Sequence, residues 1–368
     1  MKGDQEVPQS DSGGEELLVA IDDSRAFISG FFYHTIDGKP AYAPFCLETV
    51  ALPDPSLSFL PEDVSVKASS RGLLCCHGRR TNHYYVCNPL NRVWAALPPQ
   101  RNVHSPGTAV VLVLHQSQAQ PRGTPRDFWV VCKYSDVAGL AGEFSVEKFS
   151  SATWRWEEES WAEEPLGRVE CGLAANGEAW WRMTKQTIVA YNPQTNLVRT
   201  ISGIDDGLMD KGRSAWWEMG EVGGLPCITN VVAAAPPQEP FLKAEVLCMF
   251  LDEQDVQIYE GGWCGFMEGV SEQNVRPLRM QGAKEMVFWD GDRRIFGCDL
   301  WNRQTRVLVI NTPDYCTDFL PYCFSALPFR KECRRPADDD DEDDDDDDDD
   351  DDLDDWLQYL SLEDYETN

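Results

Sequence analysis

A short strand-turn-strand pattern that recurs along the chain constrains its fold more than any other feature. The clearest copy is YYVCNPLNRVWAALPP, residues 84–99, with the turn at NPLN, residues 88–91. A second copy, TIVAYNPQTNLVRTI, has its turn at NPQT, residues 192–195. Asparagine at the first turn position can accept a hydrogen bond from the backbone ahead of it, and proline at the second presets φ for a type I turn. Both segments therefore predict antiparallel hairpins.

Weaker copies of the pattern place their turns at Ser150, Asp252 and Asn302. The five turns are about 54 residues apart on average, which is near the ~50-residue period of kelch-type propeller blades. The dipeptides Asp-Gly and Asn-Gly, which favour tight hairpins, add turns at residues 37–38, 176–177 and 290–291. Six hairpin-bearing units fit between residues 24 and 335.

These units predict an all-β fold, because no long stretch of this region has the 3.6-residue period of a helix. Many short strands form either a sandwich or a propeller. A single sandwich is too small for about 310 residues, whereas six four-stranded blades of about 50 residues account for them. We therefore predict a kelch-like β-propeller of six blades over residues 24–335. Seven blades are the alternative, since residues 203–246 are weakly patterned.

Charge divides the rest of the chain from this predicted propeller. The formal net charge is -31, and residues 338–352 are fifteen consecutive acids. We expect residues 1–23 and the acidic tail, residues 336–368, to be disordered outside a short helix at 353–361, because like charges repel and bury no apolar surface. Such charge repels nucleic-acid phosphates and anionic lipids, so neither nucleic acid nor a membrane is an expected partner. Basic proteins are compatible with it.

The tail helix is expected to present one apolar face, formed by Leu353, Trp356, Leu357 and Leu360 at i, i+3, i+4 and i+7. Acidic-aromatic segments of this kind often fold as they bind a basic or apolar partner, so these four residues are the candidate partner-binding site. The alternative is a tail that only increases solubility.

Cysteine usage and apolar runs predict where the protein resides. The 13 cysteines are an odd number and lie mostly within apolar runs, which indicates buried reduced thiols. The longest apolar runs, such as residues 108–114 and 228–235, are far shorter than the ~20 residues that cross a bilayer. The N-terminus is polar and acidic, unlike a secretory signal. We expect a cytoplasmic or nuclear protein, or one found in both.

No catalytic, cofactor or metal site is expected. The sequence contains no G-x-S-x-G, H-E-x-x-H, G-x-G-x-x-G or P-loop motif. His77 and His83 lie among three cysteines, but the adjacent Cys75 and Cys76 would point to opposite faces of a strand and could not share one metal. The pair Trp180 and Trp181 invites a recognition surface; core packing is the favoured interpretation, because neighbours on a strand alternate faces.

Several of these segments together resemble the plant F-box-associated β-propeller, a kelch-like region. SSRGLLCCH, residues 69–77, is similar to the family's small-Gly-Leu-Leu strand, and residues 84–99 resemble its Asn-Pro, basic-Trp, Leu-Pro-Pro segment. CGLAANGEAWWRM, residues 171–183, and the hairpin after it resemble another of its units, and PYCFSALPF, residues 321–329, its closing segment. The resemblance covers about residues 24–329.

The resemblance implies that the propeller binds a protein target, as the substrate-recognition region of plant F-box proteins does for ubiquitin ligase-mediated degradation. A Skp-type adaptor and a cullin are the further partners it implies. Residues 1–25 do not show the helical pattern of an F-box, so target binding is the part of the family's role that the resemblance implies for this chain. The chain is then expected to be either a free-standing binding propeller or a truncated gene product. The alternative function is a scaffold or histone-binding protein that acts through the acidic tail.

Overall fold

The computed structural model describes residues 28–45, 52–105, 107–115, 126–134, 143–162, 169–183, 187–201, 216–222, 224–233, 242–251, 256–265, 276–281, 285–289, 294–299, 305–310, 319–323 and 331. The chain divides into two compact units, Met1–Cys333 and Arg334–Asn368, and the described residues all belong to the first. They form 24 strands and no helix, so they contain no helix that could cross a membrane.

Three of the sheets are each made from four consecutive antiparallel strands. The first contains β3 (Val64–Ser70), β4 (Leu73–Gly78), β5 (Tyr84–Asn88) and β6 (Val93–Ala96). The second contains β7 (Ala109–Leu114), β8 (Phe128–Tyr134), β9 (Glu143–Ser150) and β10 (Arg155–Ala162). The third contains β11 (Val169–Ala175), β12 (Glu178–Met183), β13 (Ile188–Asn192) and β14 (Leu197–Ile201).

Two further sheets exchange a short segment of chain. One contains β15 (Trp216–Val222), β16 (Leu225–Ala233), β17 (Leu242–Leu251) and β18 (Val256–Gly265). The other contains β19 (Arg276–Pro277), β21 (Glu285–Trp289), β22 (Arg294–Asp299) and β23 (Thr305–Ile310). Between β19 and β21, the short β20 (Met280–Gln281) pairs in parallel with β15. β20 is therefore the fifth strand of the β15–β18 sheet, and the chain crosses from one sheet to the other on either side of it.

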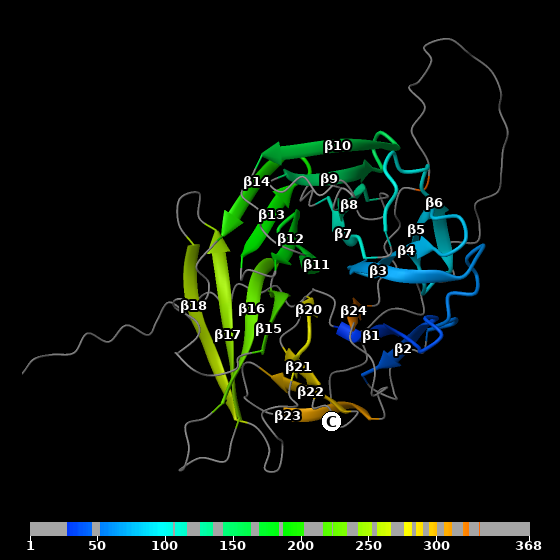
Figure 1. Ribbon diagram of the computed structural model, residues 1–368. Helices are drawn as coiled ribbons and strands as arrows, with labels where there is room; N and C mark the ends of the chain where they lie inside the picture. The colour runs from blue at the N-terminus through cyan, green and yellow to red at the C-terminus, as the bar shows by residue number, and fades with distance from the viewer. Residues whose placement is uncertain are drawn as a thin grey trace, which may run out of the picture. The chain divides into compact units, whose positions relative to one another are not determined.

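The sixth sheet joins the two ends of the described chain. In it, β24 (Leu320–Cys323) pairs with β1 (Ile28–His34), and β1 pairs with β2 (Pro40–Pro44). The six sheets follow one another around a centre (Figure 1). Their innermost strands contact each other in turn, from β24 through β3, β7, β11 and β15 to the β19–β20 segment and back to β24. The all-β propeller that the sequence predicts is confirmed, with five sheets of four or five strands and a three-stranded sheet that closes the ring.

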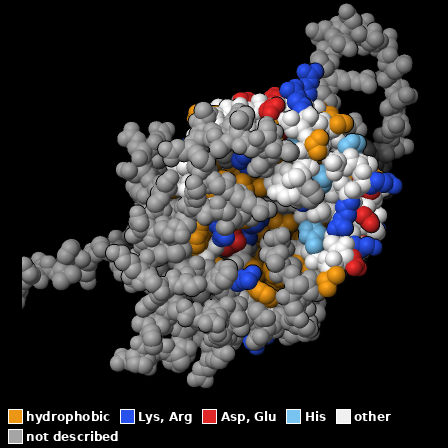
Figure 2. All heavy atoms as spheres, in the orientation of Figure 1, with side chains coloured by type: hydrophobic (Ala, Val, Ile, Leu, Met, Phe, Trp, Pro, Cys, Tyr) orange, Lys and Arg blue, Asp and Glu red, His pale blue; other side chains and the backbone are white. Residues whose placement is uncertain are grey.

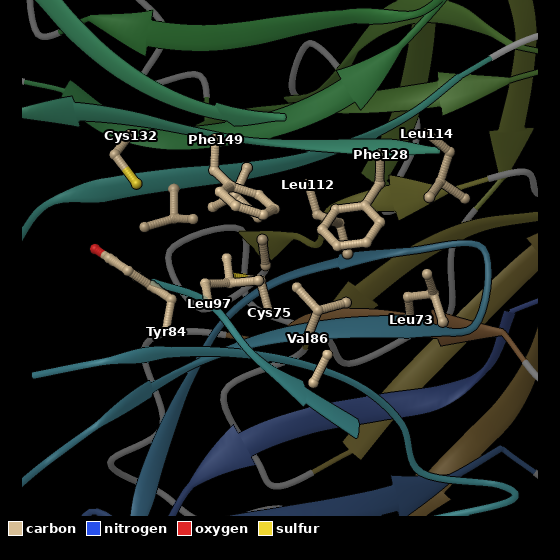
Figure 3. Close-up of a cluster of buried hydrophobic side chains, with 14 of the residues drawn as sticks. Leu73, Cys75, Tyr84, Val86, Leu97, Leu112, Leu114, Phe128, Cys132 and Phe149 are labelled. Carbon is tan, nitrogen blue, oxygen red and sulfur yellow. The ribbon is translucent and has the colours of Figure 1, made fainter. Parts of the chain in front are cut away.

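The hydrophobic core is divided into clusters, each between two neighbouring sheets. Figure 3 shows the cluster between the β3–β6 and β7–β10 sheets, where Tyr84 and Val86 face Phe128 and Phe149. Cys75 belongs to this cluster, whereas Cys76 packs in the cluster on the opposite side of its sheet. The prediction that these adjacent thiols point to opposite faces is therefore confirmed. Because successive side chains of a strand point to opposite faces, β4 contributes to the packing on both sides of its sheet.

Trp180 and Trp181 follow the same rule. Trp180 packs toward the β15–β18 sheet with Met219 and Ile228, and Trp181 packs toward the β7–β10 sheet with valines of β7, β8 and β9. Both indoles are at most 1% exposed, so the expected packing role is confirmed for this pair.

The recurring turn joins the third and fourth strands of its sheet. Asn88 Oδ1 accepts a hydrogen bond from the Leu90 backbone N–H at 3.0 Å, and Asn192 Oδ1 accepts from Gln194 and Thr195. The predicted chemistry of asparagine is confirmed at both turns. The structure adds a feature that the sequence did not suggest. The fifth residue of three copies, Arg92, Trp154 and Asn196, has a left-handed φ of 54–58°.

Candidate functional site

A cavity of about 240 Å³ lies where the innermost strands begin. Four of the six sheets form its wall, with residues 65–67 of β3, 107–110 at the start of β7, and Val169, Cys171 and Gly172 of β11. His34 at the end of β1, Leu320 of β24 and Arg279 between β19 and β20 complete it. Only a ring of sheets brings these distant residues together, so this cavity is the candidate site.

Two cationic side chains, Lys67 and Arg279, line the cavity. Lys67 lies at a register shift in β3 between Val66 and Ala68, where the extra residue forms a β-bulge against β4. Bulges re-aim side chains and are frequent beside functional sites. Arg279 lies on the two-residue connection between β19 and β20, and its Nε is buried without a hydrogen-bond partner. Figure 2 shows basic atoms and one acidic group among apolar side chains near the centre of the face drawn there.

His34 holds the wall of the cavity at β3. Its Nε2 accepts a hydrogen bond from the Val66 backbone N–H at 3.0 Å and lies 3.3 Å from the Ser65 hydroxyl. Because a backbone N–H can only donate, Nε2 is unprotonated and this ring is the neutral tautomer with its proton on Nδ1. The neutral ring fixes the strand that carries Lys67 without adding a charge.

Thr108 contributes a hydroxyl to the wall. Its side chain is 7% exposed, and Oγ1 has no hydrogen-bond partner. A buried hydroxyl without a partner costs free energy, so such a group in a cavity wall is a candidate for binding a ligand. Its backbone N–H donates to the Ser105 carbonyl at 3.0 Å, which shapes the connection entering β7.

A buried network holds the start of that connection. Glu147 of β9 accepts hydrogen bonds from the backbone N–H groups of Arg101 and Asn102 at 2.6 and 3.1 Å. His104 bridges Glu147 and the Tyr84 hydroxyl at 3.1 and 2.9 Å. The Glu147 and His104 side chains have no exposed surface, so no ligand reaches them in this structure. Their arrangement therefore positions the segment that leads to Thr108.

Burial raises the pKa of Glu147, but the hydrogen bonds from His104 and from the backbone of Arg101 and Asn102 lower the pKa by more than burial raises it. The net result is a pKa below the ordinary value, so the carboxylate remains ionised in the folded protein.

A thiol and a carboxylate lie on the β11 side of the cavity. Cys171 Sγ donates to Glu218 Oε1 at 2.9 Å, and burial raises the pKa of Cys171 far above its ordinary value. This thiol is therefore not a nucleophile at neutral pH. Arg279 and Arg182 act on it electrostatically, and Arg182 stacks on the Trp217 ring at 4.6 Å. Glu218 is thus the acidic counterpart of the cations on this side.

Beyond the cavity, the centre of the ring narrows. The next space has a volume of only about 10 Å³, lined by small and apolar residues of β3, β7, β11 and β24 and again by Arg279. That volume holds at most one water molecule. Gly172, Leu320 and Arg279 line both spaces, so Arg279 lies where the two spaces meet.

The four residues predicted to bind a partner, Leu353, Trp356, Leu357 and Leu360, lie outside the described residues. In the part of the chain that is described, no group of three or more metal-ligating side chains occurs. Cys75, Cys76 and Cys87 are buried free thiols. Burial raises the pKa of Cys75 and Cys76 well above the ordinary value.

The sequence named no residue of this cavity as part of a binding site. Lys67 could have been suspected, because it is a cation within the alternating strand VSVKASS, which is otherwise built of small and apolar residues. Arg279 and Thr108 carry no comparable signal. They reach the cavity only through the closure of the ring.

Comparisons with known proteins give no family and no function for this chain. No family model and no curated protein match it. Matching solved structures include a nidogen/laminin complex, with 10% identity, a TM-score of 0.41 and coverage of 79% of this chain and 95% of that chain. The SapL1 lectin in complex with alpha methyl fucoside matches with 13% identity, a TM-score of 0.43 and coverage of 80% and 99%. The fission yeast SREBP-SCAP binding domains match with 9% identity, a TM-score of 0.34 and coverage of 81% and 77%. At these values the likenesses carry no inference about ligands.

Proposed function

We propose that this chain is a non-enzymatic propeller that binds a protein target at the end of the ring where the cavity opens. The observation that carries the proposal is the composite wall of that cavity, which is built by four sheets, through β1, β24, β3, β7 and β11, and by Arg279 on the connection between β19 and β20. Propeller loops positioned by a rigid scaffold are suited to recognition because they vary without disturbing the sheets.

We further propose that target binding serves ubiquitin ligase-mediated degradation, as the resemblance to the F-box-associated propeller implies. A Skp-type adaptor and a cullin are then the expected partners. The free buried thiols among the described residues suit a reducing compartment, so we place this activity in the cytoplasm or nucleus.

The second candidate is a scaffold that captures histones or other basic proteins through the acidic run at residues 338–352. Fifteen consecutive carboxylates attract a basic partner over long range, and salt screens that attraction. In this alternative, the propeller only carries the tail.

The two candidates are separated by affinity purification with the full chain and with a chain ending at residue 337. Target binding by the propeller predicts the same captured proteins with both baits, cross-linked to residues that line the cavity, such as His34, Lys67 and Thr108. Thermal unfolding of both baits controls for loss of the fold.

Recovery of a Skp-type adaptor and a cullin with either bait would support the ligase role. Basic proteins retained only by the full chain, with no cross-links around the cavity, would contradict propeller binding and favour the tail.

A further inference from the structure

The cavity is lined by groups that favour a negatively charged ligand. It is lined by two cations, Lys67 and Arg279, and by a Thr108 hydroxyl that is buried and has no hydrogen-bond partner. Glu218, the carboxylate beside it, already accepts hydrogen bonds from Cys171 Sγ and from the Met219 backbone N–H. Lys67, Arg279 and Thr108 favour a small oxyanion, because each of the three can donate a hydrogen bond to one.

From this arrangement we propose that the cavity binds an anionic side chain of the target protein, a carboxylate or a phosphorylated hydroxyl. The inference rests on the proposed function and names the chemistry of its ligand. About 240 Å³ is enough for the end of one side chain, and the adjoining space of about 10 Å³ is too small for another.

The negative charge of the whole chain restricts which acidic ligands can bind in the cavity. The chain carries a formal net charge of -31, so its overall field repels an acidic ligand. Binding must therefore depend on local contacts with Lys67 and Arg279, which lie in a partly enclosed wall where electrostatic interactions are stronger than in bulk water. Acidic residues elsewhere on the target would weaken binding, and the proposal predicts an isolated acidic group as the recognised feature.

The test uses the full chain and three small probes: N-acetylglutamate amide, its neutral isostere N-acetylglutamine amide, and N-acetyl-O-phosphoserine amide. Ligand-observed saturation-transfer NMR measures their binding to the unmodified protein and to variants. We expect one or both anionic probes to bind and the neutral amide to bind at least tenfold more weakly. Whether the glutamate or the phosphoserine probe binds more tightly identifies the source of the oxyanion.

Two variants test the cations that line the cavity, and a variant of an exposed arginine on β10 is the control. Lys67→Gln and Arg279→Gln should each weaken the anionic probe about tenfold, the effect of losing about 1.4 kcal/mol of interaction. Arg155→Gln removes an exposed charge from the outermost strand β10 and should leave binding unchanged. If Arg279→Gln does not fold, Arg279→Lys keeps the charge and removes the planar fork, so weaker binding is still expected.

Thr108→Val separates binding from stability. It replaces the unpartnered hydroxyl with a methyl group of similar shape, so the unfolding temperature should stay the same or rise, while the anionic probe binds several-fold more weakly. Equal binding of the neutral and anionic probes, or unchanged binding in both cation variants, would overturn the oxyanion site. A target that still cross-links around the cavity in Lys67→Gln and Arg279→Gln would leave the proposed function standing and reject only this inference.

Discussion

His104 Nε2 lies 3.1 Å from Glu147 Oε2, and both side chains are completely buried between the β3–β6 and β7–β10 sheets. The same carboxylate accepts two backbone hydrogen bonds from the connection between β6 and β7. One glutamate on β9 therefore holds the segment that ends at the cavity wall. The site and the stability of the interface between these sheets are coupled through it.

Replacing Glu147 with glutamine should destabilise the protein. The amide cannot accept all of the hydrogen bonds that the carboxylate accepts, and a charged acceptor contributes about 1.5–3 kcal/mol. We expect the free energy of unfolding, measured by urea denaturation, to fall by about 2 kcal/mol or more. Glu157→Gln is the matched control, since that side chain is 49% exposed and pairs with Lys148 at 3.2 Å. Its effect should stay below about 1 kcal/mol, and equal losses would contradict the role of the network.

Glu62 should give the protein a distinct acid dependence. Burial raises the pKa of Glu62, but hydrogen bonds from Thr81 and Tyr85 and from the Arg80 backbone outweigh it and lower the pKa to about 2. A lowered folded-state pKa stabilises the fold above the ordinary value of 4.5, and this contribution is lost as the pH falls toward about 2.

Urea unfolding of the unmodified protein and of Glu62→Gln, measured from pH 6 to pH 2, tests this dependence. The difference in free energy of unfolding between the two should shrink as the pH falls through that window. A difference that is constant with pH would show that Glu62 acts only through packing.

The turn asparagines should contribute through their side-chain acceptors. Asn192→Ala removes the hydrogen bonds from the Gln194 and Thr195 backbone at 3.0 and 3.1 Å and should cost about 1–2 kcal/mol of unfolding free energy. Gln194→Ala, an exposed change in the same turn, should stay within about 0.5 kcal/mol. Chemical denaturation measures the free energy of unfolding of both variants. Similar losses in the two would show that the Asn192 side-chain hydrogen bonds do not stabilise the fold.

Trp181 should be essential to the interface between the β7–β10 and β11–β14 sheets. The indole is fully buried among valines of β7, β8 and β9, so Trp181→Ala leaves a cavity and should cost about 3–5 kcal/mol. Trp94, which is 37% exposed on β6, is the control and should cost much less when changed to alanine. Calorimetric unfolding of the two variants checks the order, and a larger loss at Trp94 would contradict the packing described here.

Particular residues show how far sequence reasoning reaches. The hairpins at Asn88 and Asn192 could be predicted because their turn chemistry is local, and a hydrogen bond two or three residues ahead needs no tertiary contact. The left-handed φ at Arg92 and Trp154 was missed, since neither residue type favours that region. The network of Glu147, His104 and Tyr84 was missed because its members are 20–63 residues apart and meet only between two sheets.

By itself the sequence determined the strand period, the turns, the all-β class and the repetition that makes a ring, since each follows from neighbours along the chain. Only the tertiary structure decided which residues share the central cavity, where Lys67, Thr108 and Arg279 meet although more than 200 residues separate the first from the last. The physical reason is that ring closure, through the pairing of β24 with β1 and the contact of each inner strand with the next, sets these distances, and closure depends on packing between sheets.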